Sequence, residues 1–143
     1  MTTIGRTLAV AVVSAGLCLT ASTATAVDGW VSSSSSNGKG WGGSHIDFTG
    51  SRSVDFGRTE LNDLVCDGKK VWIIHWISPY QDGAFFNVGQ TGRQDCETDK
   101  VYRFDGPRVT HPDPIRRAAI SVCYGEYSID NCSALIKRDN GHN

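Results

Sequence analysis

The chain has 143 residues, of which 14 are basic and 15 acidic, so its formal net charge is −1. A protein so close to neutral has no electrostatic attraction to nucleic acid or to an anionic membrane surface, so neither is expected as a partner. After the first 26 residues no long apolar run occurs, and the remaining length suits a single domain.

Residues 1–26 have the three parts of a secretory signal peptide. Arg6 is their only charge, an apolar stretch follows it, and the small residues TASTATA lead to a cleavage site expected after Ala26. The apolar stretch is shorter than the roughly 20 residues that span a bilayer. Cys18 raises the alternative of a lipoprotein, but Leu17 precedes it where acylation sites want a small residue. We expect a secreted, extracellular protein, free of the membrane once cleaved.

Residues 27–43, with the sequence VDGWVSSSSSNGKGWGG, form a serine- and glycine-rich tract. Trp30 and Trp41 are its only large apolar side chains. Such a composition buries too little surface to offset the entropy lost on ordering. The tract is therefore predicted to be a flexible tail in front of a domain that covers residues 44–143.

From Ser44 onward, short apolar runs alternate with turn dipeptides. The dipeptides Asp67-Gly68, Asp82-Gly83 and Asp105-Gly106 lie between β-prone residues, which is a strong hairpin signal. Eight runs are predicted as strands, at 45–48, 53–56, 61–66, 70–77, 84–88, 100–104, 118–124 and 132–137. The fold class is therefore all-β, a small disulfide-bridged β-sandwich or barrel-like domain.

Two of these runs depart from simple alternation. Residues 71–77 are apolar on both faces except at His75, which predicts a central strand and a buried, hydrogen-bonded histidine. Residues 114–122 also fit a helix, because Asp113-Pro114 resembles an N-cap followed by a first-turn proline. We favour a strand there, since the β-branched residues come late and Cys123 must reach a bridge.

Four cysteines remain after the leader: Cys66, Cys96, Cys123 and Cys132. An even number in an exported chain implies two disulfides, with three possible connectivities. Proximity in sequence favours Cys66 with Cys96 and Cys123 with Cys132. No CxxC or HxxxH pair occurs and the histidines are scattered, so we expect no metal site and no cofactor.

Catalytic motifs are absent from the sequence: there is no nucleophile elbow, protease triad context or phosphate-binding glycine loop. A small secreted ribonuclease is the enzymatic alternative, with Glu60 as base, His111 as acid and Arg93 or Arg116 on the phosphate. Any chain of this size offers such a trio, so we predict no enzyme activity. A carbohydrate-binding, lectin-like domain is a second alternative, although Asp-Gly pairs also serve simple tight turns.

The tract with two tryptophans is the feature that best predicts a function. Tryptophan is enriched among the residues that dominate interface energetics. Trp30 and Trp41, on a segment that does not fold alone, are therefore the candidate binding residues for a partner. The alternatives are that they pack back on the domain or that the tract is a spacer.

These features together resemble the small secreted adaptor subunit of the umbrella toxin particles of streptomycetes. The resemblance rests on the export signal, the mature N-terminus VDGWVSSSSSNGKGWGG and the compact four-cysteine domain from Ser44. It implies a non-enzymatic adaptor that links other secreted proteins, a scaffold and a lectin-type subunit, in an extracellular antibacterial toxin complex. Of the site residues, it carries over only Trp30 and Trp41.

Overall fold

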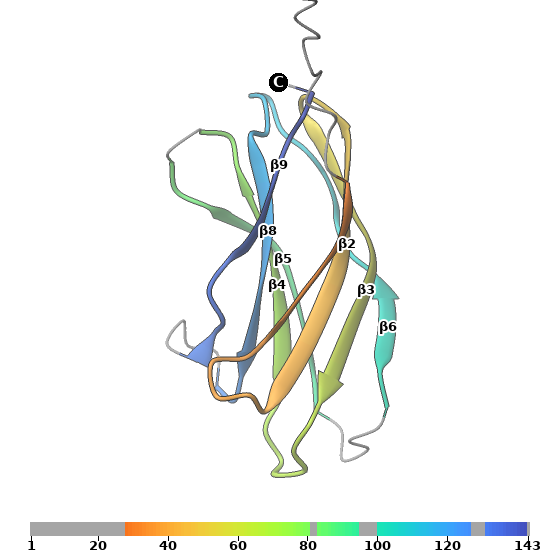
Figure 1. Ribbon diagram of the computed structural model, residues 1–143, viewed down its shortest axis with the longest axis vertical. Helices are drawn as coiled ribbons and strands as arrows, with labels where there is room; N and C mark the ends of the chain where they lie inside the picture. Colours follow the sequence, from red (N-terminus) through yellow and green to blue (C-terminus); the bar gives the residue numbers. More distant parts are fainter. Residues whose placement is uncertain (1–27, 81–82, 95–99, 127–130, 143) are drawn as a thin grey trace, which may run out of the picture.

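The computed structural model describes residues 28–80, 83–94, 100–126 and 131–142, and these form an all-β fold (Figure 1). Strands follow one another in the order β1 Gly29–Ser34, β2 Gly40–Gly50, β3 Ser53–Asp63, β4 Val71–Ser78, β5 Phe86–Arg93, β6 Tyr102–Asp105, β7 Arg108–Thr110, β8 Arg117–Tyr124 and β9 Ile136–Asp139. The signal peptide predicted for residues 1–26 lies outside the described residues.

Two antiparallel sheets face each other as the layers of a sandwich (Figure 1). The first has the strand order β1-β2-β3-β6, and the short strand β7 continues the β6 edge along β3. The second has the order β5-β4-β8-β9. The predicted sandwich is thus confirmed, and β4, the apolar run at 71–77, is a central strand as expected.

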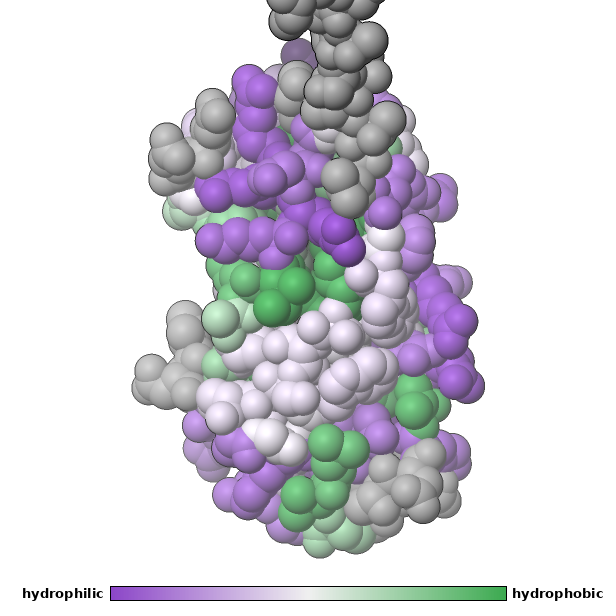
Figure 2. All heavy atoms as spheres, in the orientation of Figure 1, coloured by the Kyte–Doolittle hydropathy of each residue, from purple (hydrophilic) through white to green (hydrophobic). Residues whose placement is uncertain are grey.

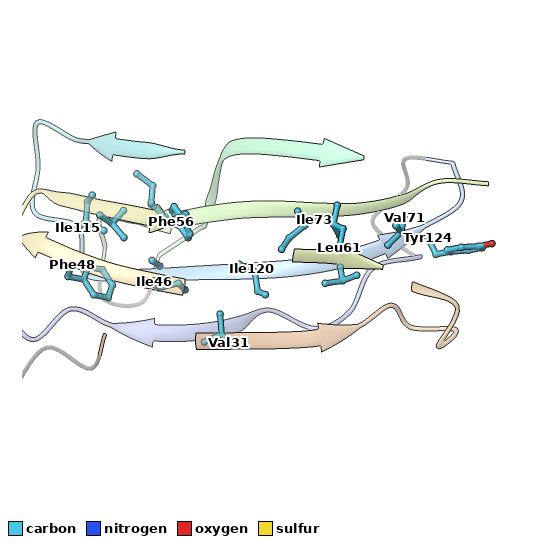
Figure 3. Packing of buried hydrophobic residues seen from close by; sticks show 14 residues of the cluster. Val31, Ile46, Phe48, Phe56, Leu61, Val71, Ile73, Ile115, Ile120 and Tyr124 are labelled. Carbon is cyan, nitrogen blue, oxygen red and sulfur yellow. The ribbon is translucent and has the colours of Figure 1, made fainter. Parts of the chain in front are cut away.

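The core lies between the two sheets, where inward side chains from both layers meet (Figure 3). Its largest fully buried apolar members are Phe48, Phe56, Ile46, Leu61, Ile73, Ile115 and Ile120. Alternation along the strands explains most of this set, because successive side chains of a strand point to opposite faces of its sheet. Phe56 and Leu61, five residues apart on β3, both face inward because the β2–β3 register shifts between them, and Ile115 lies just before β8. Burial of such side chains stabilises the fold by about 1.5–3 kcal/mol each.

The predicted flexible tail is wrong for the described residues from Asp28 onward. Residues 29–34 form β1 in unbroken register with β2, and the domain therefore begins before Ser44. A tight turn joins the two strands: the Ser35 N–H donates to the Gly40 carbonyl at 2.8 Å, and Gly38 adopts a φ of +70°, which favours glycine. Backbone pairing supplies the stabilisation that the side-chain composition lacks.

Two of the three Asp-Gly hairpin predictions are also wrong. Asp67-Gly68 lies on the connection from β3 to β4, which belong to different sheets. Asp105-Gly106 lies between β6 and β7, which both pair with β3 and not with each other. Asp82 lies outside the described residues, although its flanking strands β4 and β5 do pair antiparallel. A glycine turn marks a change of direction, whichever strands it joins.

The segment around residues 114–122, which could have been a strand or a helix, contributes to a strand. β8 spans Arg117–Tyr124 and pairs with β4. The predicted disulfide between Cys123 and Cys132 is confirmed, and it ties the end of β8 to the segment before β9. Cys66 is also disulfide-bonded. Its predicted partner, Cys96, lies outside the described residues.

His75 is the buried core residue that the sequence predicted, with 1% of its surface exposed. Its ring packs edge-on against Phe56, with 4.7 Å between the ring centroids. Its Nε2 lies 3.4 Å from the hydroxyl of Thr59. Desolvation by the core lowers the pKa of His75 to about 4, because burial disfavours the charged imidazolium.

Burial of His75 makes the stability of the fold depend on pH. The unfolded chain protonates His75 near its ordinary pKa of 6.5, while the folded chain resists protonation, so stability falls as the pH drops from about 6.5 towards 4. We expect His75→Leu to remove this part of the pH dependence, a difference of about 2–3 kcal/mol in the free energy of unfolding. Urea titrations of both proteins at pH 7 and pH 4 measure it; parallel losses in the two proteins would contradict it.

Candidate functional site

Trp30 and Trp41, the predicted binding residues, lie together on the outer face of the first sheet. Their ring centroids are 6.3 Å apart and the planes are tilted by 33°. In the register of β1 with β2, Trp30 stands opposite His45, four residues from Trp41. The two rings therefore lean along the sheet towards each other, and 37% of Trp30 remains exposed.

Trp30 can pack on β2 because Gly43 has no side chain. Gly43 lies midway between Trp41 and His45 on the same face of β2, and a Cβ there would come within 2.3 Å of the Trp30 ring. The indole thus lies directly on the backbone of β2. Replacing Gly43 by any larger residue would displace Trp30, so glycine at this position shapes the site.

Glu60 lies on β3 directly opposite Gly43, and only 9% of its side chain is exposed. Two arginines cover it. Arg103 on β6 donates from Nε to Oε1 at 2.9 Å, and Arg58 on β3 donates from Nε to the same oxygen at 2.8 Å, with a further contact from its Nη2. The carboxylate is therefore held on the sheet surface between two guanidinium groups.

This arrangement keeps Glu60 ionised. Desolvation alone would raise its pKa, but the hydrogen bonds and charges of Arg103 and Arg58 outweigh it and hold the pKa of Glu60 below its ordinary value. Both arginine side chains are more than 60% exposed, so solvent screens their attraction for the carboxylate. Glu60 is consequently a weak proton acceptor and a permanent hydrogen-bond acceptor at neutral pH.

These residues line a shallow cleft of about 380 Å³, formed by Trp30, Trp41, His45, Arg58 and Glu60. One wall is aromatic and the opposite wall is charged, and the groups come from three neighbouring strands. The cleft thus offers a flat apolar surface beside guanidinium donors that point into solvent. Such a surface suits recognition of a partner by packing and hydrogen bonding.

The ribonuclease trio is not assembled. Glu60 and His111 lie at opposite ends of β3, because His111 follows β7 and β7 pairs with Ser53–Asp55. Seven residues of strand, about 23 Å, separate Ser53 from Glu60. The guanidinium of Arg93 instead packs over the ring of Tyr102, at 4.2 Å from the ring centroid.

A larger hollow of about 570 Å³ lies at one end of the sandwich. Three lysines line it, but two of these lie over aromatic rings, Lys39 over Tyr124 and Lys70 over Trp72. Lys39 also pairs with Asp67 at 3.7 Å. None of the sequence-predicted binding residues lines this hollow, so the tryptophan cleft is the candidate site.

Within the part of the chain that the structure describes, no three His, Cys, Asp or Glu side chains group closely enough to hold a metal ion. Those residues also include no helix long and apolar enough to cross a membrane. No known family model, curated protein or solved structure matches this chain.

Sequence reasoning named the two tryptophans and Glu60 but missed His45, Arg58 and Arg103 as their neighbours. The signal that could have revealed these neighbours is the alternation of side chains between the two faces of a strand. Trp41, Gly43 and His45 occupy every second position of β2, and Arg58 and Glu60 do so on β3. Alternation places them on one face only after residues 40–50 are taken as a strand, which the tail interpretation prevented.

The arginine pair on Glu60 predicts a measurable pH effect. The ionised carboxylate contributes stability that is complete above its ordinary pKa of 4.5 and is lost as the pH falls through the lower folded value. We expect Glu60→Gln to unfold about 1–2 kcal/mol more easily at pH 7, with this deficit shrinking at pH 3. Thermal or urea unfolding at both pH values measures it, and a deficit that persists at pH 3 would be contrary to this assignment.

Proposed function

We propose that this protein is a secreted, non-enzymatic protein-binding module whose working surface is the tryptophan cleft. The observation that carries the proposal is the side-by-side placement of Trp30 and Trp41 on an open sheet face, next to exposed arginines. Tryptophan and arginine are the residue types most enriched among interface hot spots. A rigid β-sheet presents them at low entropic cost, because their backbone is already ordered.

The resemblance to umbrella toxin adaptors supplies the finer form of this proposal. In that form the module links a scaffold subunit and a lectin-type subunit of an extracellular antibacterial complex. The binding residues remain Trp30 and Trp41, but they act from a folded strand pair and not from a loose tail. An adaptor needs two separate surfaces, and the cleft provides one of them.

Carbohydrate binding is the second candidate, and the aromatic wall of the cleft favours it. A sugar ring can pack its C–H face on an indole while hydroxyl groups bond to nearby charged side chains. Arg58 and Glu60 would supply a donor and an acceptor within the same cleft. Enzymatic action on such a ligand is less well supported, since the lowered pKa of Glu60 disfavours it as a general base.

Alanine substitution in the cleft tests the proposal. We expect Trp30→Ala and Trp41→Ala each to weaken partner capture at least about tenfold, because each removes a large apolar contact without unfolding the core. Tagged proteins incubated with the native culture supernatant, followed by protein identification and titration of the captured partner, measure the effect. Circular dichroism checks the fold.

Phe86→Ala is the matched control, since Phe86 is an exposed aromatic residue, 47% accessible, on β5 of the other sheet. Equal capture by the Trp30→Ala protein, or a greater loss from the control, would refute the proposal. Capture of polysaccharide in place of protein, abolished by the same two variants and by soluble oligosaccharides, would select the carbohydrate-binding candidate.

A further inference from the structure

The four edges of the two sheets are protected to very different degrees. Charged side chains protect the β9 edge, with Lys137, Arg138 and Asp139 in succession. The bulge where the β4–β5 register shifts interrupts β5. The edge made by β6 and β7 consists of two short strands broken at Gly106-Pro107. These are the ordinary devices that stop an edge from pairing with another chain.

β1 has none of these devices. Its six residues, GWVSSS, contain no charge and no proline, and the pairing with β2 runs without a register shift. Side chains there are mostly small, so nothing bulky stands in the way of an approaching strand. Among the edges of the described residues, β1 is therefore the one best able to accept a further strand.

The hydrogen-bonding groups of β1 can be assigned from two contacts. Ser35 pairs inward, since its N–H donates to the carbonyl of Gly40, whereas the carbonyl of Trp30 points outward and accepts from Arg138 at 3.2 Å. Antiparallel strands alternate inward and outward groups. Ser32 and Ser34 consequently present their N–H and C=O groups away from β2, and both residues are exposed.

Arg138 limits how much of the β1 edge can pair with another strand. It reaches across from β9 in the opposite sheet and caps the carbonyl of Trp30. Pairing with another strand is thus obstructed at Trp30 and open at Ser32 and Ser34. The Ser34 carbonyl accepts a hydrogen bond only from the hydroxyl of the neighbouring Ser33, at 3.3 Å. A donor from an incoming strand could replace it.

The flank of the sandwich beside this edge is apolar. Figure 2 shows a green patch between β9 and the pale band over β1. Leu135, just before β9, and Ile136, the first residue of β9, are only partly buried, and Ile136 packs on the edge of the core. A strand paired with Ser32 and Ser34 would cover this patch with every second side chain and place the others on the outer face of the first sheet.

We propose that β1 receives an extended segment of the partner protein as an added strand, paired with Ser32 and Ser34. The inference rests on the proposed function and gives its recognition mode. The segment has apolar residues at alternate positions, which cover the flank, and lacks proline at its pairing positions. Main-chain hydrogen bonds hold the segment, and its other side chains lie on the outer face of the sheet, the same face as the tryptophan cleft.

A second copy of this chain is a poorer occupant. A two-fold axis through Ser33 would pair Ser32 of each copy with Ser34 of the other and leave the Trp30 carbonyl with Arg138. On the face that would cover the apolar flank, however, a second β1 offers Ser33 and Ser35 beside Val31, which its own core buries. A partner segment can present an apolar residue at each of these positions.

A soluble strand peptide tests the proposal without the natural partner. The probe is acetyl-Lys-Thr-Val-Thr-Val-Thr-Lys-amide at about 1 mM, and the control peptide has proline in place of its central threonine. Amide hydrogen exchange of the isotope-labelled protein from Val27 onward is followed by NMR. We expect the Ser32 and Ser34 amides to exchange about fivefold more slowly with the probe and not with the control.

Ser32→Pro removes an outward N–H that the fold does not use, so it should abolish the protection at Ser34 while the amides of β3, β4 and β8 keep their chemical shifts. Ser32→Thr keeps the N–H and should bind as before. Unchanged exchange at both serines with the probe, protection at β5 instead, or protection that rises with protein concentration alone would overturn the inference. In those cases, lost capture by the Trp30→Ala protein would still support the proposed function.

Discussion

The contact between the Trp30 indole and the backbone of Gly43 is the interaction on which the candidate site depends. A Cβ at Gly43 would lie 2.3 Å from the ring, so this close packing is available only to glycine. The contact fixes Trp30 on the sheet, brings it beside Trp41 and covers the β1–β2 pair with apolar surface. Through it, the largest side chain of a segment poor in apolar residues packs on the sheet and forms part of the candidate site.

A group of charged side chains forms the other side of the candidate site. The Arg58–Glu60–Arg103 group lies on the other side of β2 from Trp30. The Glu60 carboxylate accepts hydrogen bonds from both arginines, and each guanidinium group keeps further N–H donors for a partner. The cleft and the β1 edge are adjacent because Trp30 belongs to both. A partner segment along β1 would therefore meet main-chain donors and acceptors, an aromatic surface and cationic side chains within a few residues of one another.

Much of the fold could be predicted from the sequence, because strand alternation and cysteine spacing are local signals. The apolar run at 71–77 indicated the central strand, His75 its buried polar member, and Cys123 with Cys132 a local bridge. The order of residues 29–43 could not be predicted from composition. Composition describes only the side chains of the segment. β1 is held mainly by backbone pairing with β2 and by glycines that let side chains pack directly on the backbone.

The sequence named only some of the residues that line the candidate cleft, for a similar reason. Trp30 and Trp41 were chosen by residue type, which needs no structure, but their neighbours depend on strand register. Glu60 was placed with His111 because both suit acid–base chemistry, whereas the register sets it opposite Gly43 and beside Arg103. Register is fixed by turns and bulges such as those at Ser44/Ile46, and short sequence patterns do not reveal these.

Amide hydrogen exchange along residues 29–35 of the free protein tests the central claim, that this segment is an ordered edge strand. We expect slow exchange at Val31, Ser33 and Ser35, whose N–H groups pair with β2, and fast exchange at Ser32 and Ser34 between them. Uniformly fast exchange from Gly29 to Ser35 would mean that the segment is a loose tail and would contradict the claim.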